Sequence, residues 1–97
     1  MKESPVHVVL IEFEIYLPYS HSLKEKRMCL RGIKDRLAKL NVAIAEVGYQ
    51  DSWQRSRIAC TSVSNEKRLL LQLKSQIENL LQENLDGELI SCDLEWL

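Results

Sequence analysis

The chain has 97 residues, of which 45% are hydrophobic and 28% are charged, with only three glycines and two prolines. This length predicts a single domain over residues 1–97, and the composition excludes collagen-like, disordered and disulfide-scaffold proteins. The formal net charge of −1 gives no global field that would attract a polyanion, so binding to nucleic acid would have to be local.

The first strand and the first helix are the clearest elements. Residues 6–17 alternate with a period of two and are rich in β-branched residues, which predicts a strand with one buried face. Apolar residues at helical spacing predict a helix over residues 23–40. Ser22 and Glu25 form a Ser-x-x-Glu capping box, so we expect this helix to begin at Leu23.

The rest of the chain continues with strands and one more helix. Alternation predicts strands at residues 42–50 and 56–63, the latter weaker because both of its faces carry small or polar residues. A second helical stripe runs from about residue 66 to residue 84, and Gly87 is placed to end it. Residues 88–97 alternate again and predict the last strand.

The order of elements, β-α-β-β-α-β, predicts an α+β fold. Two right-handed crossovers on one antiparallel sheet give a ferredoxin-like βαββαβ sandwich, with a four-stranded antiparallel sheet and two helices on one face. In this topology the loop after the first strand, the hairpin between the second and third strands, and the turn before the fourth strand lie at one end of the sheet.

The start of the first helix carries an unusual charge pattern. Lys24, Lys26 and Arg27 occupy its first turns, although the positive end of a helix dipole favours anions. The topology brings these cations near Arg55 of the hairpin, with Tyr49 and Trp53 among them, and cations interleaved with aromatic residues are what phosphate-plus-stacking recognition of single-stranded RNA requires. We therefore predict an RNA- or anion-binding edge that consists of Ser22, Lys24, Lys26, Arg27, Tyr49, Gln50, Trp53 and Arg55.

Structural roles compete with this interpretation. Trp53 could instead fill the end of the core or a subunit interface. Lys26 or Arg27 could form a structural ion pair with Asp51 or Glu46 and contact no ligand.

The sheet face opposite the helices is predicted to be acidic. An RNA-recognition motif of this fold needs aromatic and basic residues on that face, so readout of RNA there is disfavoured. Leu10, Tyr16 and Leu89 leave room for a partly apolar homodimer contact on the same face, and the alternative is a solvated sheet. The acids expected there are Glu12, Glu14, Glu46, Asp93 and Glu95.

Neither metal nor catalytic motifs are recognisable. Cys29, Cys60 and Cys92 form no Cys-x-x-Cys pair, which predicts reduced core cysteines and no metal or cofactor. The chain has no Gly-rich phosphate loop, Gly-x-Ser-x-Gly elbow or His-x-x-x-His motif, so we expect no enzyme. It has no signal-peptide pattern and no apolar run of the ~20 residues that a membrane span needs, so we expect a cytoplasmic protein without membrane contact.

Three segments resemble a known family. They are residues 21–27 (HSLKEKR), residues 45–51 (AEVGYQD) followed by Trp53-Gln54-Arg55, and residues 63–65 (VSN). Together they resemble the YlxP-like family of small bacterial proteins, a domain of unknown function, over nearly the whole chain. The resemblance implies a ferredoxin-like fold, a bacterial cytoplasmic protein and no established activity. The resemblance also implies that, in some members, the gene for the protein lies beside genes for translation initiation and ribosome maturation.

Three hypotheses about function follow. The first is a non-enzymatic module that binds RNA or a ribosomal particle through the basic and aromatic edge. The second is a homodimer or a protein–protein adaptor, and the third is a domain that binds a small anionic ligand at the start of the first helix.

Overall fold

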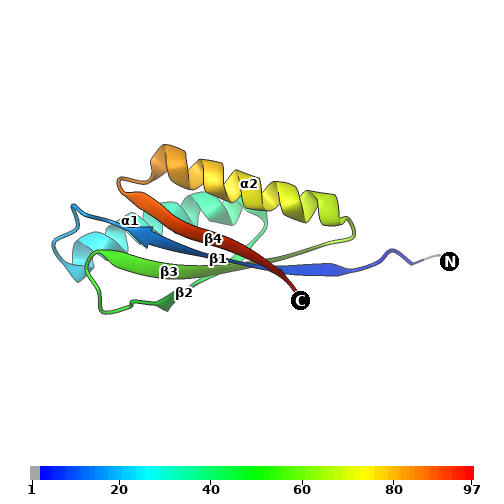
Figure 1. The fold of residues 1–97 in the computed structure, drawn as a ribbon, viewed down its shortest axis with the longest axis horizontal. Coiled ribbons are helices and arrows are strands. Elements are labelled where there is room, and N and C mark those ends of the chain that lie inside the picture. The colour runs from blue at the N-terminus through cyan, green and yellow to red at the C-terminus, as the bar shows by residue number, and fades with distance from the viewer. Residues whose placement is uncertain (1–2) are drawn as a thin grey trace.

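Two helices lie side by side on one face of an antiparallel sheet in the computed structural model of the protein, which describes residues 3–97 (Figure 1). The elements in chain order are β1 (His7–Tyr16), α1 (Leu23–Leu37), a 3₁₀ turn η1 (Ala38–Leu40), β2 (Ala43–Gly48), β3 (Arg55–Ser64), α2 (Lys67–Asn84) and β4 (Glu88–Trp96). The predicted helices and strands are all present. The first helix differs at its end, where its last turn tightens and Asn41 adopts a left-handed conformation with φ of 60°.

The four strands form one sheet in the order β2-β3-β1-β4, and each neighbouring pair is antiparallel. This confirms the predicted ferredoxin-like arrangement. The β1–α1 loop, the β2–β3 hairpin and the α2–β4 turn lie together at one end (Figure 1). Throughout, we call this end the loop end, and define it as residues 17–22, 49–54 and 85–87.

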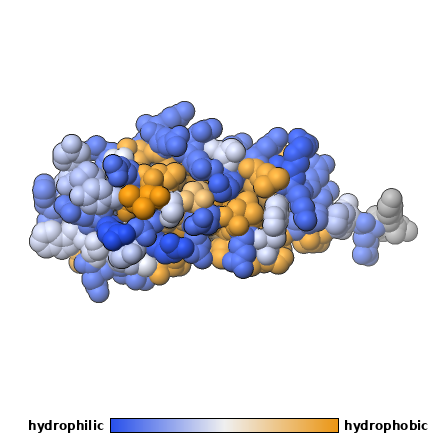
Figure 2. All heavy atoms as spheres, viewed as in Figure 1, coloured by the Kyte–Doolittle hydropathy of each residue, from blue (hydrophilic) through white to orange (hydrophobic). Residues whose placement is uncertain are grey.

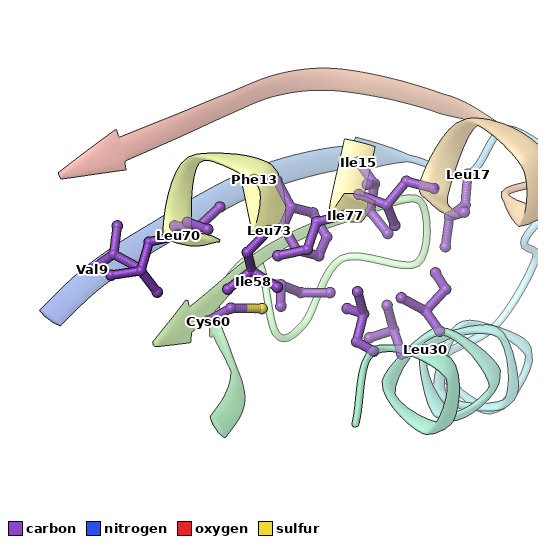
Figure 3. Packing of buried hydrophobic residues seen from close by; sticks show 14 residues of the cluster. Val9, Phe13, Ile15, Leu17, Leu30, Ile58, Cys60, Leu70, Leu73 and Ile77 are labelled. Carbon is purple, nitrogen blue, oxygen red and sulfur yellow. The ribbon is translucent and has the colours of Figure 1, made fainter. Parts of the chain in front are cut away.

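The core lies between the sheet and the two helices. Figure 3 shows Leu70, Leu73 and Ile77 of α2 pointing toward Phe13 and Ile15 of β1. The core also takes in the predicted buried face of β1 and the apolar stripe of α1. Its members are Val9, Ile11, Phe13, Ile15, Leu17, Leu30, Ile33, Leu37, Ile58, Cys60, Leu70, Leu73, Ile77 and Leu81.

The strand β3, which the sequence predicted weakly, carries small polar residues on its buried face, and these residues are hydrogen-bonded. Ser56 Oγ donates to Glu46 Oε2 at 2.7 Å, and Ser62 Oγ donates to the Asn41 carbonyl oxygen at 2.8 Å. Buried hydroxyl groups are tolerated when they are hydrogen-bonded in this way. The three cysteines are free, and burial raises the pKa of the Cys60 thiol to about 11.

Two residues lie on the opposite sheet face from the one predicted. Glu46 was expected on the sheet face opposite the helices, but it pairs with Ile58 in the register and therefore faces the helices. Leu89 was also expected there, but it pairs with Ile15 and packs against the core. The cause for Leu89 is a register shift in the β1–β4 pairing beside Ile15, which interrupts the alternation of β4 and leaves Ile90 exposed.

No helix within residues 3–97 is long and apolar enough to cross a membrane.

Candidate functional site at the loop end

Gln54 fastens two of the three connections at the loop end to each other. Its side-chain Nε2 donates to the carbonyl oxygens of Pro18 and Ser20, at 3.1 and 3.3 Å. Its own carbonyl oxygen accepts from the Leu17 amide at 2.7 Å. The predicted meeting of the β1–α1 loop with the β2–β3 hairpin is therefore confirmed. This role of Gln54 could not be predicted from the sequence, because an amide that bridges two loops leaves no periodic pattern.

The capping box at the start of α1 is also confirmed. Ser22 Oγ accepts from the Glu25 amide at 3.1 Å, and Glu25 Oε2 accepts from the His21 amide at 2.7 Å. These bonds satisfy backbone donors that a helix N-terminus otherwise leaves free. Ser22, which we predicted as a ligand contact, thus has a clear structural role as the N-cap.

Lys26 lies inside the protein and not on its surface. Its side chain is 1% exposed, with Nζ 2.9 Å from Glu46 Oε2, and Nζ also donates to the Tyr49 carbonyl oxygen at 2.6 Å. A cation buried to this extent cannot reach a phosphate, so the predicted ligand contact of Lys26 is wrong. The structural ion pair with Glu46, which we stated as the alternative, is the arrangement found.

The acid in this pair is held in its charged form. Burial alone would raise the pKa of Glu46, but hydrogen bonds from Ser56 and Lys26, together with the Lys26 charge, outweigh burial. The pKa of Glu46 therefore lies below its ordinary value of 4.5. A buried lysine needs such a partner, because an unpaired ammonium in the interior is strongly destabilising.

The same lysine shapes the β2–β3 hairpin. Tyr49 has a φ of 57°, a left-handed conformation that is uncommon for a residue with a side chain. Its carbonyl oxygen accepts from both Lys26 Nζ and the Ser52 amide, the latter at 3.0 Å. These two donors hold the hairpin in the form that presents the Tyr49 ring.

Three aromatic side chains stand exposed at the loop end. Tyr19 is 70% exposed, Tyr49 43% and Trp53 55%. Figure 2 shows that residues of pale, intermediate hydropathy, the shade that Tyr and Trp have, gather on this end beside strongly hydrophilic ones. At this exposure Trp53 does not fill the end of the core, so that alternative is wrong, while an interface role stays open.

Cations flank these aromatic residues. The Arg55 guanidinium lies 4.5 Å from the centroid of the Tyr49 ring and pairs with Glu14, and these contacts hold it beside the hairpin. The hydrogen bond that Arg55 donates to the Glu14 carboxylate raises the pKa of Arg55. Lys24 and Arg27 are exposed and form no ion pair within residues 3–97. Gln50, also predicted here, is exposed at the hairpin tip.

Sequence reasoning missed two more cations on the same side of α1. Arg31 and Lys34 follow Lys24 by seven and ten residues, which places all three on one helical face with Arg27. Neither Arg31 nor Lys34 has an ion-pair partner in the described part of the chain. A search for cations at i, i+3, i+7 and i+10 would have found this basic stripe, which we define as Lys24, Arg27, Arg31 and Lys34. Asp35 lies next to the stripe in sequence.

A shallow hollow at the loop end is acidic. Its volume is about 150 Å³, and its lining includes Glu25, Asp86 and Cys29. Burial and, secondarily, Asp86 raise the pKa of the Cys29 thiol. Because the capping box already uses the helix N-terminus and the hollow carries acids, a small anion finds no suitable pocket there. Within residues 3–97, no three His, Cys, Asp or Glu side chains gather in a group that could hold a metal ion.

The family model described as "Protein of unknown function (DUF503)" matches residues 8–94 of the chain. The chain belongs to the DUF503 family. A curated protein similar to this DUF503 member is "Uncharacterized protein YlxP" of Bacillus subtilis (strain 168). The two are 38% identical over 71 residues, which are 72% of this chain and 74% of that protein. The resemblance to YlxP-like proteins is thereby confirmed, and neither description states a function.

Of two solved structures similar to this DUF503 chain, the first supports the fold alone. The de novo designed protein Ferredog-Diesel has a TM-score of 0.52 at 18% identity, covering 98% of this chain and 88% of its own. An amidase of the hydantoinase/carbamoylase family from Burkholderia phymatum has a TM-score of 0.49 at 9% identity, over 97% of this chain and 28% of its own. The second likeness is too distant to bear on function.

Proposed function

We propose that the protein is a non-enzymatic module that binds single-stranded RNA, on a ribosomal particle, through the loop end. The observation that carries this proposal is that three exposed aromatic residues, Tyr19, Tyr49 and Trp53, lie at the same end of the fold as two exposed cations in the first turns of α1, Lys24 and Arg27, which have no ion-pair partner among residues 3–97. Large exposed aromatic groups that gather in one place mark interaction surfaces. Rings beside cations fit RNA, because bases stack on the rings while phosphates take the charges.

The buried contacts below the surface support the same proposal. Lys26 and Gln54 fix the hairpin and the β1–α1 loop relative to each other, so the exposed rings are held before a ligand arrives. A preformed surface loses less conformational freedom on binding. In this proposal Lys24, Arg27 and Arg55 contact phosphates, Trp53 stacks on a base, and Lys26 positions the hairpin.

Salt dependence of RNA binding tests the proposal directly. The affinity for fluorescein-labelled single-stranded poly(U) would be measured by fluorescence anisotropy from about 50 to about 200 mM salt. Each phosphate neutralised on a single strand contributes a slope of about −0.7 to log K against log salt. Lys24→Glu/Arg27→Glu should therefore weaken binding and flatten the slope by about 1.4. Trp53→Ala should cost about 1–3 kcal/mol of binding free energy, with little change of slope.

A charge-matched control lies at the opposite end of the molecule. Lys39 and Arg68 are both exposed there, so Lys39→Glu/Arg68→Glu changes the net charge by the same amount. This variant should bind RNA much more tightly than Lys24→Glu/Arg27→Glu. Equal losses in the two variants, or an affinity that does not depend on salt, would contradict the proposed site.

A pull-down from bacterial lysate separates RNA from protein partners. Ribosomal RNA that is recovered with the wild type should disappear after ribonuclease treatment and with Lys24→Glu/Arg27→Glu. Recovery of one protein partner that ribonuclease does not affect, and that Trp53→Ala abolishes, would instead favour an adaptor that binds protein through the same exposed tryptophan.

A further inference from the structure

The sheet face opposite the helices is uncovered. Both helices lie on one side of the sheet in Figure 1, and no element within residues 3–97 covers the other side. We call this uncovered surface the open face. Its two central strands contribute Val8, Leu10, Glu12, Glu14 and Tyr16 from β1, and Arg55, Arg57, Ala59, Thr61 and Val63 from β3.

Opposite charges on the open face occupy neighbouring strands. The two arginines stand on β3 and the two glutamates stand on β1. Arg57 donates from Nη2 and Nε to Glu12 Oε2, at 2.6 and 2.9 Å, and Arg55 pairs with Glu14. A column of cations therefore runs directly beside a column of anions.

The other half of the open face is apolar and hollowed. Leu10 borders a depression of about 210 Å³. The depression forms where the neighbouring strands β2 and β3 carry short side chains. Ala43 pairs with Thr61, and Ala45 pairs with Ala59, so this floor is built from short residues over two strands. A leucine side chain from another molecule could enter such a depression.

We propose that two copies of the chain pack open face to open face, about a two-fold axis that runs parallel to the strands between β1 and β3. This axis lays β1 of each copy over β3 of the other. Because Leu10 pairs with Thr61 within one chain, the axis places Leu10 of each copy over the partner's Thr61, at the depression. In the same way it places Arg57 over the partner's Glu14. The charge pattern is thus self-complementary, as an isologous interface requires.

The dimensions fit such a contact. The width of the face is set by four strands about 4.8 Å apart, and its length by the ten residues of β1 at about 3.3 Å each. Together they give an area of roughly 600 Å². A stable interface buries about 800 Å² per partner, which is of similar size. The same axis lays β4 of each copy over the partner's β2 at the rim of the contact, which places Glu95 and Asp93 over the partner's Ala43 and Ala45.

Sedimentation velocity at protein concentrations up to about 1 mM tests the proposal. The wild type should form a concentration-dependent dimer, and Leu10→Asp should raise the dimer dissociation constant at least about tenfold, because an unpaired carboxylate would enter the depression. Leu71→Asp is the matched control, since Leu71 is 52% exposed on α2, away from the open face. It should leave the dissociation constant unchanged. Circular dichroism confirms that both variants are folded.

A charge reversal provides a second test that does not depend on the depression. Arg57→Glu should weaken the dimer, and adding Glu14→Arg in the same chain should restore it, because Glu14 pairs with Arg57 in the β1–β3 register and the exchanged charges again face each other within each chain and across the axis. A wild type that stays monomeric over the whole concentration range would overturn the proposal. A dimer that Leu10→Asp leaves intact would also overturn it. If Trp53→Ala alone dissociated that dimer, the contact would lie at the loop end. Arg55 belongs to both proposed surfaces, but the RNA-binding tests use Lys24, Arg27 and Trp53, which lie outside the open face, so the two proposals can fail separately.

Discussion

A buried lysine determines how the loop end is built. Lys26 meets Glu46 on one side and the Tyr49 carbonyl oxygen on the other, so a single ammonium joins α1, β2 and the hairpin. Such a pair contributes less than its Coulomb attraction suggests, because both ions lose water on burial. Breaking the pair is nevertheless costly, since removal of either partner leaves the other charge buried and uncompensated.

Loss of the acid should therefore be more harmful than loss of both charges. Glu46→Gln leaves Lys26 charged and buried, and we expect a loss of about 3 kcal/mol in the free energy of unfolding. Lys26→Met/Glu46→Gln should be more stable than Glu46→Gln alone, because no uncompensated charge remains. Urea denaturation measures both. The ion-pair interpretation would be wrong if the double variant were the less stable of the two.

The lowered pKa of Glu46 also predicts a pH dependence. In the unfolded chain this carboxyl group takes up a proton near its ordinary pKa of 4.5, whereas in the folded protein it stays charged to lower pH. Between these two values the unfolded state binds more protons, so stability rises with pH. The contribution is complete above the unfolded pKa and is lost as the pH falls through the folded pKa. The stability difference between wild type and Glu46→Gln should accordingly shrink below pH 4.5, as measured by urea denaturation across the acid range.

At the scale of elements, the helices and strands are set by periodicity, but their junctions depend on backbone space. Gly87, at a junction, and Gly32, inside a helix, show the contrast. A Cβ at Gly87 would overlap the Tyr16 carbonyl oxygen, so β4 can start beside the end of β1 only with glycine there. A Cβ at Gly32, in the middle of α1, would meet only the end of the flexible Arg36 side chain, at 3.4 Å.

Alanine at these two positions should act in opposite directions. Gly32→Ala should stabilise the protein by about 1 kcal/mol, because alanine is the better helix former and the site is open. Gly87→Ala should destabilise it by about 2 kcal/mol, because the backbone of β1 has to move. Thermal unfolding followed by circular dichroism compares the two variants. A destabilised Gly32→Ala would mean that α1 needs glycine at this position for a reason other than space.

For the whole molecule, the order of elements was enough to predict the fold and the meeting of the loops. The capping box at Ser22 and the alternation of β1 are local patterns that fix the start of one helix and the buried face of the central strand. Once the crossovers are right-handed, the β1–α1 loop and the hairpin have to meet. The family resemblance pointed to the same two segments.

The details that sequence reasoning missed depend on contacts between strands. Apolar residues occupy both faces of β2, Ala45 on one and Ile44 on the other, so hydropathy did not reveal that Glu46 faces the helices. The irregularity beside Ile15 reverses the alternation of β4 at Leu89, and no turn residue marks it. The burial of Lys26 follows from the position of Glu46, and therefore the first error led to the second.

The placement of the two ends of the fold has a practical consequence. The Leu97 amide donates to the Val8 carbonyl oxygen at 3.0 Å, which ties the last residue to the start of β1, at the far end of the sheet from the hairpin (Figure 1). A tether or a fluorescent label joined after Leu97 would thus sit the length of a strand away from Trp53. The protein can be immobilised by that end on a sensor surface, with its exposed aromatic rings directed into solution.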